Sequence, residues 1–199
     1  MRTEEIKIYT FEELDKKAKE KAREWYKDGM CHDFFVEAEM ITDNMENVLY
    51  INGYSNTKVY WSLSNCQGDG VCFTWEIYGY DEDIIPLLNR IYDNNIPKNI
   101  LPVLPFIKIE FKGNRSNYCH KNTVRVDYSS TTRSYIDGCY RVEKVIDELV
   151  ETLDEDRKNL CDILEKQGYD EIDYYYSDEY IDETIICNEY EFYADGTKY

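Results

Sequence analysis

Apolar residues recur at helical spacing near the start of the chain. Over residues 11–28 they return every three or four positions, with Lys and Glu between them, which predicts an amphipathic helix. Thr10 is expected to cap this helix, with Glu13 three residues further on completing a capping box. Gly29 is expected to end it. Less regular apolar spacing predicts a second helix over residues 32–50.

Four segments carry strand patterns. Residues 58–63 and 71–78 are rich in β-forming residues and are separated by a glycine-containing loop, so they are expected to form a hairpin. Residues 106–112 alternate strictly between apolar and polar types, and residues 121–128 alternate as well. The turn of this second hairpin is expected at residues 113–117. Because no long helix separates the members of either pair, the sheet is predicted to be antiparallel.

Helical patterns occupy most of the remaining chain. A short helix with Asp83 as its cap is predicted over residues 81–94. After Asp137-Gly138 a long helix is predicted to about Gln167, with apolar residues in a narrow arc and acidic residues on the opposite side. A final short helix capped by Ser177 is followed by a terminal strand and turn.

These elements predict an α+β fold, in which an antiparallel sheet of about four strands packs against helices, including one long C-terminal helix. The sequence has neither an internal repeat nor a clear boundary, so residues 1–199 are expected to form a single domain. Asp156 breaks the pattern of the long helix because it points toward the apolar side. We therefore expect a kink or a paired charge at that position.

Composition favours a folded protein in the cytoplasm. The chain has 20 Tyr and 3 Trp, too many for a disordered protein. Residues 1–7 contain no apolar run, and no later segment approaches the roughly 20 apolar residues of a spanning helix. The seven cysteines are scattered and never form a Cys-x-x-Cys pair, so reduced thiols are expected, with a disulfide framework or a zinc site as the alternatives.

Negative charge is concentrated at the C-terminal end. The net charge is −18, and residues 147–199 hold 18 acidic against 4 basic side chains. Such a field repels nucleic acid and anionic membranes and attracts basic protein surfaces. Acidic side chains and interspersed tyrosines of this end are therefore predicted to bind a partner: Asp147, Glu151, Asp154, Glu155, Asp162, Glu165, Asp170, Glu171, Tyr175, Asp178, Glu179, Asp182 and Glu183. A solvated acidic face is the alternative for each acidic run taken singly.

The first hairpin carries the most distinctive short segment, Gln67-Gly68-Asp69-Gly70. Its glycines permit a ligand to approach the backbone, and Asp69 and Gln67 offer polar groups. A tight turn in which Asp69 bonds its own backbone is the alternative. His120 is expected to meet Asp69 across the sheet if the three polar residues share a site, and a solvated or structurally bonded histidine is the alternative. Gln67, Asp69 and His120 are thus the candidate ligand-binding residues, with Asp69 and His120 as candidate catalytic groups.

Other chemistry finds little support in the sequence. Cys119 and His120 are neighbours in a predicted strand and point to opposite faces, which makes a nucleophilic dyad geometrically poor. Motifs of serine hydrolases, zinc enzymes, phosphate loops and calcium loops are absent from the sequence. We expect no cofactor and no metal, and a binding role is favoured over an enzymatic one.

Several segments together carry a family resemblance. They are Tyr9-Thr-Phe-Glu-Glu-Leu and the following lysine-rich residues, Val59-Tyr-Trp-Ser-Leu-Ser with Gln67-Gly-Asp-Gly, the strand at His120, and Asn188-Glu-Tyr-Glu-Phe with Asp195-Gly196. The set resembles a family of small proteins encoded by bacteriophages and prophages, for which no activity is established. The resemblance implies early phage genes that act inside a bacterial host and counter its defences.

Two functional hypotheses follow from these observations. The first is an acidic inhibitor of a host defence protein, such as a CRISPR effector or a restriction enzyme, that binds a basic nucleic-acid site by charge mimicry and contacts neither nucleic acid nor membrane directly. The second is a small enzyme or nucleotide binder centred on Gln67, Asp69 and His120. The sequence leaves the oligomeric state and the identity of the partner open.

Overall fold

The computed structural model describes residues 5–113, 118–130 and 140–199. The chain divides into two compact units: unit 1 comprises residues 1–40 and 170–199, and unit 2 comprises residues 41–169. The predicted turn at residues 114–117 and the Asp137-Gly138 helix start lie outside the described residues. The α+β fold is confirmed, with a four-stranded antiparallel sheet and a long C-terminal helix.

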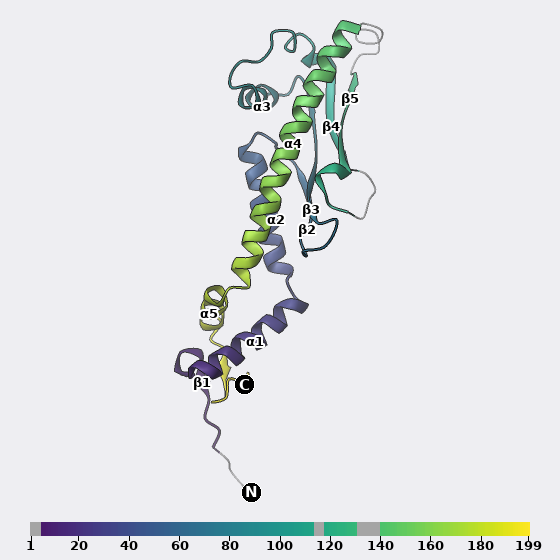
Figure 1. The fold of residues 1–199 in the computed structure, drawn as a ribbon. Coiled ribbons are helices and arrows are strands. Elements are labelled where there is room, and N and C mark those ends of the chain that lie inside the picture. Colours follow the sequence, from purple (N-terminus) through teal and green to yellow (C-terminus); the bar gives the residue numbers. More distant parts are fainter. Residues whose placement is uncertain (1–4, 114–117, 131–139) are drawn as a thin grey trace. The chain divides into compact units, whose positions relative to one another are not determined.

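Unit 2 contains the predicted sheet (Figure 1). Its strands are β2 (Lys58–Ser62), β3 (Gly70–Tyr78), β4 (Ile107–Gly113) and β5 (Val124–Ser130), in that spatial order and all antiparallel. Val59 pairs with Phe73, and Ile109 lies between Ile77 and Tyr128. Both predicted hairpins are therefore confirmed. A short 3-10 helix, η3 (Lys121–Thr123), occupies the first positions expected to be strand.

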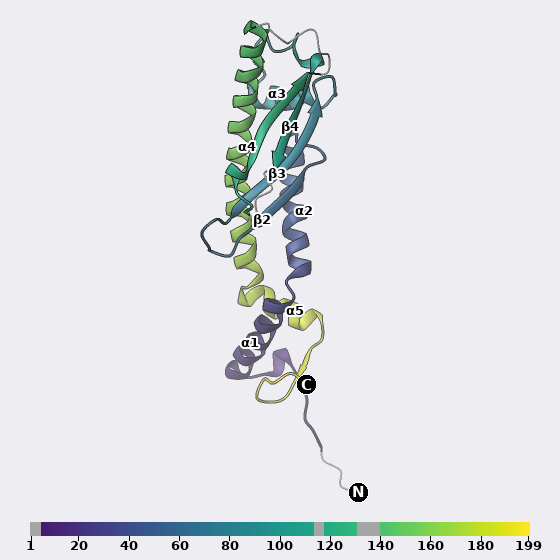
Figure 2. The same cartoon turned by 90° about the vertical axis from the view of Figure 1, so that its right-hand side faces the viewer.

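Helices cover one face of this sheet (Figure 2). They are α2 (Phe35–Ile51), α3 (Ile84–Ile91) and α4 (Tyr140–Tyr175), and the 3-10 helix η2 (Leu104–Phe106) precedes β4. Alternate strand residues point into the core: Phe73, Trp75 and Phe111 are at most 4% exposed. Their rings pack around the buried ring of Tyr54. The period of two along β3 and β4 thus builds the core.

Asp156 is the charge that the sequence places on the apolar side of α4. Its carboxylate accepts hydrogen bonds from both terminal nitrogens of Arg90 and from the Tyr54 hydroxyl, 2.7 Å away. Burial and the adjacent Asp156 carboxylate raise the pKa of Tyr54 well above its ordinary value, so Tyr54 stays a donor. The expectation of a paired charge is confirmed.

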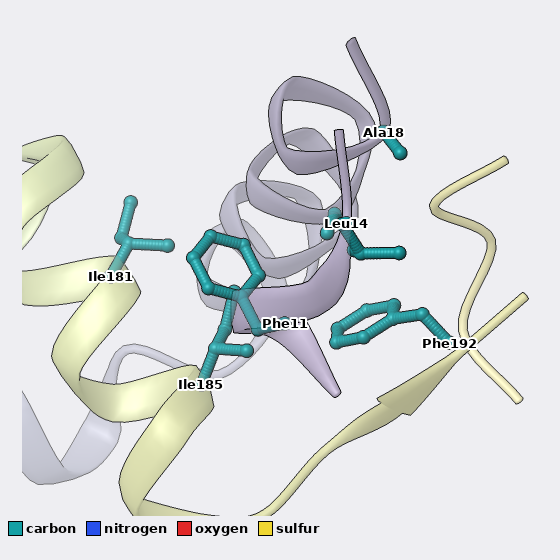
Figure 3. Close-up of a cluster of buried hydrophobic side chains, with 7 residues drawn as sticks. Phe11, Leu14, Ala18, Ile181, Ile185 and Phe192 are labelled. Atoms are coloured by element: carbon teal, nitrogen blue, oxygen red, sulfur yellow. The ribbon is translucent and has the colours of Figure 1, made fainter. Parts of the chain in front are cut away.

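Unit 1 has its own small core (Figure 3). It contains β1 (Tyr9–Thr10), η1 (Phe11–Glu13), α1 (Lys16–His32), α5 (Asp178–Cys187) and β6 (Glu191–Phe192), and β1 pairs with β6. Phe11, Leu14, Ala18, Ala22, Ile181, Ile185 and Phe192 form the buried cluster. At Gly196 a Cβ atom would lie 2.1 Å from the Ala18 carbonyl oxygen, so the C-terminal turn requires glycine there.

Several predicted helix ends were wrong. Thr10 and Glu13 form their capping box around η1, and α1 begins only after Asp15, whose carboxylate accepts from the Ala18 amide. Gly29 lies inside α1, because the burial of Met30 outweighs the modest cost of a helical glycine. Asp83 makes no capping bond to α3 and instead accepts from the Ser55 hydroxyl.

The long helix α4 also continues past its predicted end at Gln167. Gly168 is a packing position within this helix, since a Cβ atom there would lie 2.4 Å from Leu63 Cδ1 and 2.6 Å from the Met45 methyl group. The following helix begins as predicted, with Ser177 accepting a hydrogen bond from the Tyr180 amide. Among the described residues, no helix is both long and apolar enough to cross a membrane.

Candidate functional site

The Gln67-Gly68-Asp69-Gly70 loop is organised around the Asp69 carboxylate. One oxygen of this carboxylate accepts hydrogen bonds from the Ser64 amide at 2.6 Å, the Cys66 amide at 2.8 Å and the Tyr169 hydroxyl at 2.9 Å. These donors, led by the Cys66 amide, lower the pKa of Asp69. The sequence offered two interpretations of this segment, a ligand site and a tight turn in which Asp69 bonds the backbone of its own loop. The observed geometry is that of the tight turn.

The segment around His120 packs against this loop. Gly68 has a φ of +98°, and a Cβ atom there would lie 2.7 Å from the Tyr118 ring. At Gly70, a Cβ atom would lie 3.0 Å from the Cys119 carbonyl oxygen and 3.1 Å from the His120 ring. Both glycines therefore permit the loop to lie close against residues 118–120 of the same chain, and larger residues would not fit at these two positions.

The structure brings His120 near the loop but does not pair it with Asp69. The Nδ1 atom of His120 accepts a hydrogen bond from the Asn122 amide at 3.2 Å, and Asp69 bonds other groups. Gln67 is exposed at the tip. The cavity of about 690 Å³ at this end of the sheet involves none of the three candidate residues, being lined by Thr74, Phe111, Lys112, Gly113, Asn122, Thr123, Val124 and Arg125.

The cysteines and carboxylates form no chemical centre in the described part of the chain. There, Cys31, Cys66, Cys72, Cys119, Cys161 and Cys187 are free thiols. Burial raises the pKa of Cys119, and raises that of Cys161 to about 12, which disfavours the thiolate form. No group of three or more His, Cys, Asp or Glu residues within the described ranges could hold a metal ion.

The predicted acidic stripe on α4 is partly neutralised within unit 2. Asp154 accepts from Arg157 at 2.6 Å and from Lys158 at 2.7 Å, and Asp162 accepts from Lys121 at 2.6 Å. The other predicted contact residues of this stretch are exposed or half-buried: Asp147, Glu151, Glu155 and Glu165. Only part of the stripe is therefore available to a partner.

The acidic residues of unit 1 divide in the same way. Asp178 and Asp182 of α5 face α1, where they pair with Lys27 and Arg23 at distances of 2.9 and 2.6 Å. Tyr175 is buried and stacks edge-on against Phe34 and Tyr180, so its ring is a packing element. Glu171 is half-buried, and the exposed members of the predicted set are Asp170, Glu179 and Glu183.

The charges of the two units differ sharply. Unit 1 holds 21 acidic and 9 basic side chains, a net charge of −12, whereas unit 2 holds 20 and 14, a net charge of −6. Three of the basic side chains in unit 1, Lys21, Arg23 and Lys27, are already paired with its aspartates. The excess negative charge therefore belongs mainly to the smaller unit.

Sequence reasoning missed one feature of unit 1. A cavity of about 470 Å³ includes Trp25, Tyr26, Glu37 and Tyr190 in its lining. The residues come from α1, α2 and the segment before β6. Because they are far apart in the sequence, they form no local motif that could have predicted the cavity. The one available signal is Glu37, a carboxylate in a helical stretch between apolar neighbours Val36 and Ala38.

Comparison with known proteins identified no relationship. No family model, no curated protein and no solved structure matched the chain.

Proposed function

We propose that this protein binds a basic protein surface through the acidic residues of unit 1, and that it acts in this way as an inhibitor of a nucleic-acid-binding defence protein. The observation that carries the proposal is the net charge of −12 on the 70 residues of unit 1. A charge of this density disfavours the folded state by self-repulsion and exceeds what solubility requires. A positively charged partner would relieve that repulsion.

The internal ion pairs of unit 1 support the same proposal. Arg23 lies between Asp182 at 2.6 Å and Asp178 at 3.3 Å, and Lys21 contacts Asp195 at 2.6 Å. These cations hold the C-terminal segment on α1, so they cannot also compensate the outward acids. The exposed acidic residues that remain on α4, α5 and the C-terminal segment are Asp170, Asp173, Glu179, Glu183, Glu189 and Glu191.

The enzymatic alternative has weaker support. Asp69 uses its carboxylate to hold the loop, and His120 uses Nδ1 to accept from the backbone. A general base needs a free lone pair directed at a substrate within hydrogen-bond reach. We therefore favour binding over catalysis for this chain.

A matched pair of triple variants tests the proposal. The unit 1 variant carries Asp170→Asn, Glu179→Gln and Glu183→Gln, and the unit 2 control carries Asp147→Asn, Glu151→Gln and Glu155→Gln. All six residues are exposed, so each variant removes three charges of the same types. Tagged proteins are used to capture partners from a bacterial host lysate at moderate salt, where exposed charges still act over about 8–10 Å.

We expect the unit 1 variant to lose its partner while the unit 2 control keeps it. Because the partner's site is proposed to bind nucleic acid, duplex DNA should release the captured protein, and capture should weaken steeply with salt. Equal losses in both variants would show that unit 1 is not the contact surface. Capture that is indifferent to both variants and to salt would refute the charge-based mechanism.

A further inference from the structure

A cavity of about 470 Å³ lies within unit 1, at the C-terminal end of α1. Its volume falls in the range of about 300–1,000 Å³ that is typical of ligand sites. Six of the lining residues are aromatic or acidic, and the other three are Gly29, Met30 and His32. The aromatic and acidic residues are Trp25, Tyr26, Tyr190, Asp28, Asp33 and Glu37. Aromatic faces together with negative charges are the combination that recognises organic cations.

The aromatic wall is fixed in place and already attracts a cation. Trp25 meets Tyr190 edge to face at 5.3 Å and also contacts Phe192 of the buried cluster at 5.9 Å. The ammonium group of Lys198 lies 5.0 Å from the centre of the Tyr190 ring and 5.9 Å from that of Trp25. The chain's own lysine thus makes the kind of contact that an external cation would make.

Glu37 supplies a negative charge without a matching cation. Glu37 is 8% exposed, and its carboxylate accepts a hydrogen bond from the Tyr180 hydroxyl at 3.4 Å. Among the described residues, no Lys, Arg or His forms an ion pair with it. Buried carboxylates are normally paired, since desolvation is costly.

We infer that this cavity binds the guanidinium group of an arginine side chain. Arginine presents a planar cation that stacks on aromatic rings and donates two parallel hydrogen bonds to one carboxylate. Trp25 and Tyr190 provide the rings, and Glu37 provides the carboxylate. The arginine is supplied by the basic partner, and this assignment to a partner rests on the proposed function.

The test uses N-acetyl-arginine amide as the probe, with the lysine amide and the uncharged citrulline amide as comparators. The indole N–H signal of Trp25 is followed by NMR in the full chain at low salt. It is distinguished from the signals of Trp61 and Trp75 with a Trp25→Phe variant. We expect a saturable shift with the arginine amide, a weaker effect with the lysine amide and none with the citrulline amide.

Three variants sharpen the test. Glu37→Gln should weaken arginine binding about 10-fold or more, because the charge-assisted pair is lost. Glu183→Gln removes one exposed charge from unit 1 outside the cavity and should change binding less than about 2-fold. Lys198→Gln removes the ammonium group that contacts the Trp25 and Tyr190 rings and should tighten binding about 2- to 5-fold. A gain of this kind cannot arise from misfolding.

Equal binding of the arginine and citrulline amides, or equal effects of Glu37→Gln and Glu183→Gln, would overturn the inference. Lysine binding as tight as arginine binding would overturn the choice of guanidinium. The outcome is separable from that of the proposed function. If the arginine amide does not bind while charge-dependent partner capture is observed, the inference about the cavity alone is refuted. If the arginine amide binds without such capture, the proposed function is refuted and the cavity remains an arginine site.

Discussion

The two units differ in how their buried charges are compensated. Beside the core of unit 2, Asp156 is paired with Arg90, and the fully buried Arg157 is paired with Asp154. In unit 1, Glu37 is almost as buried, yet its carboxylate accepts a hydrogen bond from the Tyr180 hydroxyl at 3.4 Å and forms no ion pair with any described residue. Unit 2 therefore uses buried charge to fix its own structure. Unit 1 carries a net charge of −12, and within its described residues Glu37 has no ion-pair partner.

The outer face of the sheet follows the same rule as the core of unit 2. Glu110 lies between Lys108 at 2.8 Å and Lys112 at 2.7 Å, and both lysines lower the pKa of this carboxyl. Lys108 also contacts Glu76 on the neighbouring strand. Glu76, Glu110 and Asp127 lie directly opposite one another across β3, β4 and β5, and the neighbouring lysines of β4 compensate them through contacts along the strand and diagonally between strands. This face is therefore left with little net field for a charged partner.

The largest expected effect comes from breaking a pair in unit 2. Asp154→Ala removes the carboxylate that accepts from both Nε and a terminal nitrogen of Arg157, at 3.0 and 2.6 Å. Among the described residues, the buried guanidinium then keeps the Lys121 carbonyl as its one acceptor, at 2.7 Å. We expect a loss of about 3 kcal/mol in the free energy of unfolding, at the low end for a broken buried pair because Asp154 is partly exposed.

Chemical denaturation followed by Trp61 and Trp75 fluorescence would measure this loss, since both tryptophans belong to unit 2. The exposed Asp147→Ala variant on the same helix is the matched control and should change stability by less than about 0.5 kcal/mol. A similar small change for both variants would mean that Arg157 is compensated by another group.

In unit 1 the corresponding change should have the opposite sign. Glu37→Gln keeps the shape of the side chain and its ability to accept from the Tyr180 hydroxyl, while it removes a buried charge without a cation. Replacing a residue that serves binding at the expense of stability commonly yields about 0.5–1 kcal/mol. We expect a gain of that size, measured by denaturation followed by Trp25 fluorescence. A loss of stability would show that the Glu37 carboxylate is structural.

Sequence reasoning predicted the fold better than the boundaries of its elements. The strands were found because alternation at a period of two is a strong local signal, as residues 106–112 show. The predicted end of the first helix depended on a glycine, but glycine also occurs inside helices, for example where another side chain packs closely against the backbone. Gly29 and Gly168 lie inside helices, Gly168 because Leu63 and Met45 pack directly against it. That contact joins residues more than 100 positions apart and leaves no local pattern.

The candidate site was less predictable, because pairing is a property of the tertiary structure. Sequence counts located the excess of acidic residues but could not show that Asp154 and Asp178 are held by the chain's own cations. His120 and the glycine motif stand out in the sequence because histidine is rare in this chain. The cavity containing Glu37 did not, because its aromatic residues occur among 20 tyrosines.

The smallest global effect is expected at Asp69, which holds an exposed loop of unit 2. Hydrogen bonds from the Cys66 and Ser64 amides and the Tyr169 hydroxyl lower the pKa of its carboxyl in the folded state. The contribution of these bonds is therefore complete above the unfolded pKa of about 3.9 and is lost as the pH falls through the lower folded value. Asp69→Asn keeps one acceptor oxygen but loses the negative charge, and it places an NH2 group where the other oxygen accepts from the Ser64 hydroxyl at 3.2 Å. It should therefore weaken these hydrogen bonds and open the loop.

Amide hydrogen exchange of Ser64 and Cys66 reports this opening directly. We expect faster exchange in Asp69→Asn at neutral pH, and the difference from the unaltered chain should shrink below about pH 4. Tyr169→Phe removes one donor and leaves both amide bonds, so its effect should be smaller at every pH. If the two variants exchange alike, the Tyr169 hydroxyl rather than the backbone amides holds the loop. Unchanged exchange in Asp69→Asn would show that the loop does not need this carboxylate. The loop would then again be a candidate ligand-binding site, as an alternative to the surface of unit 1.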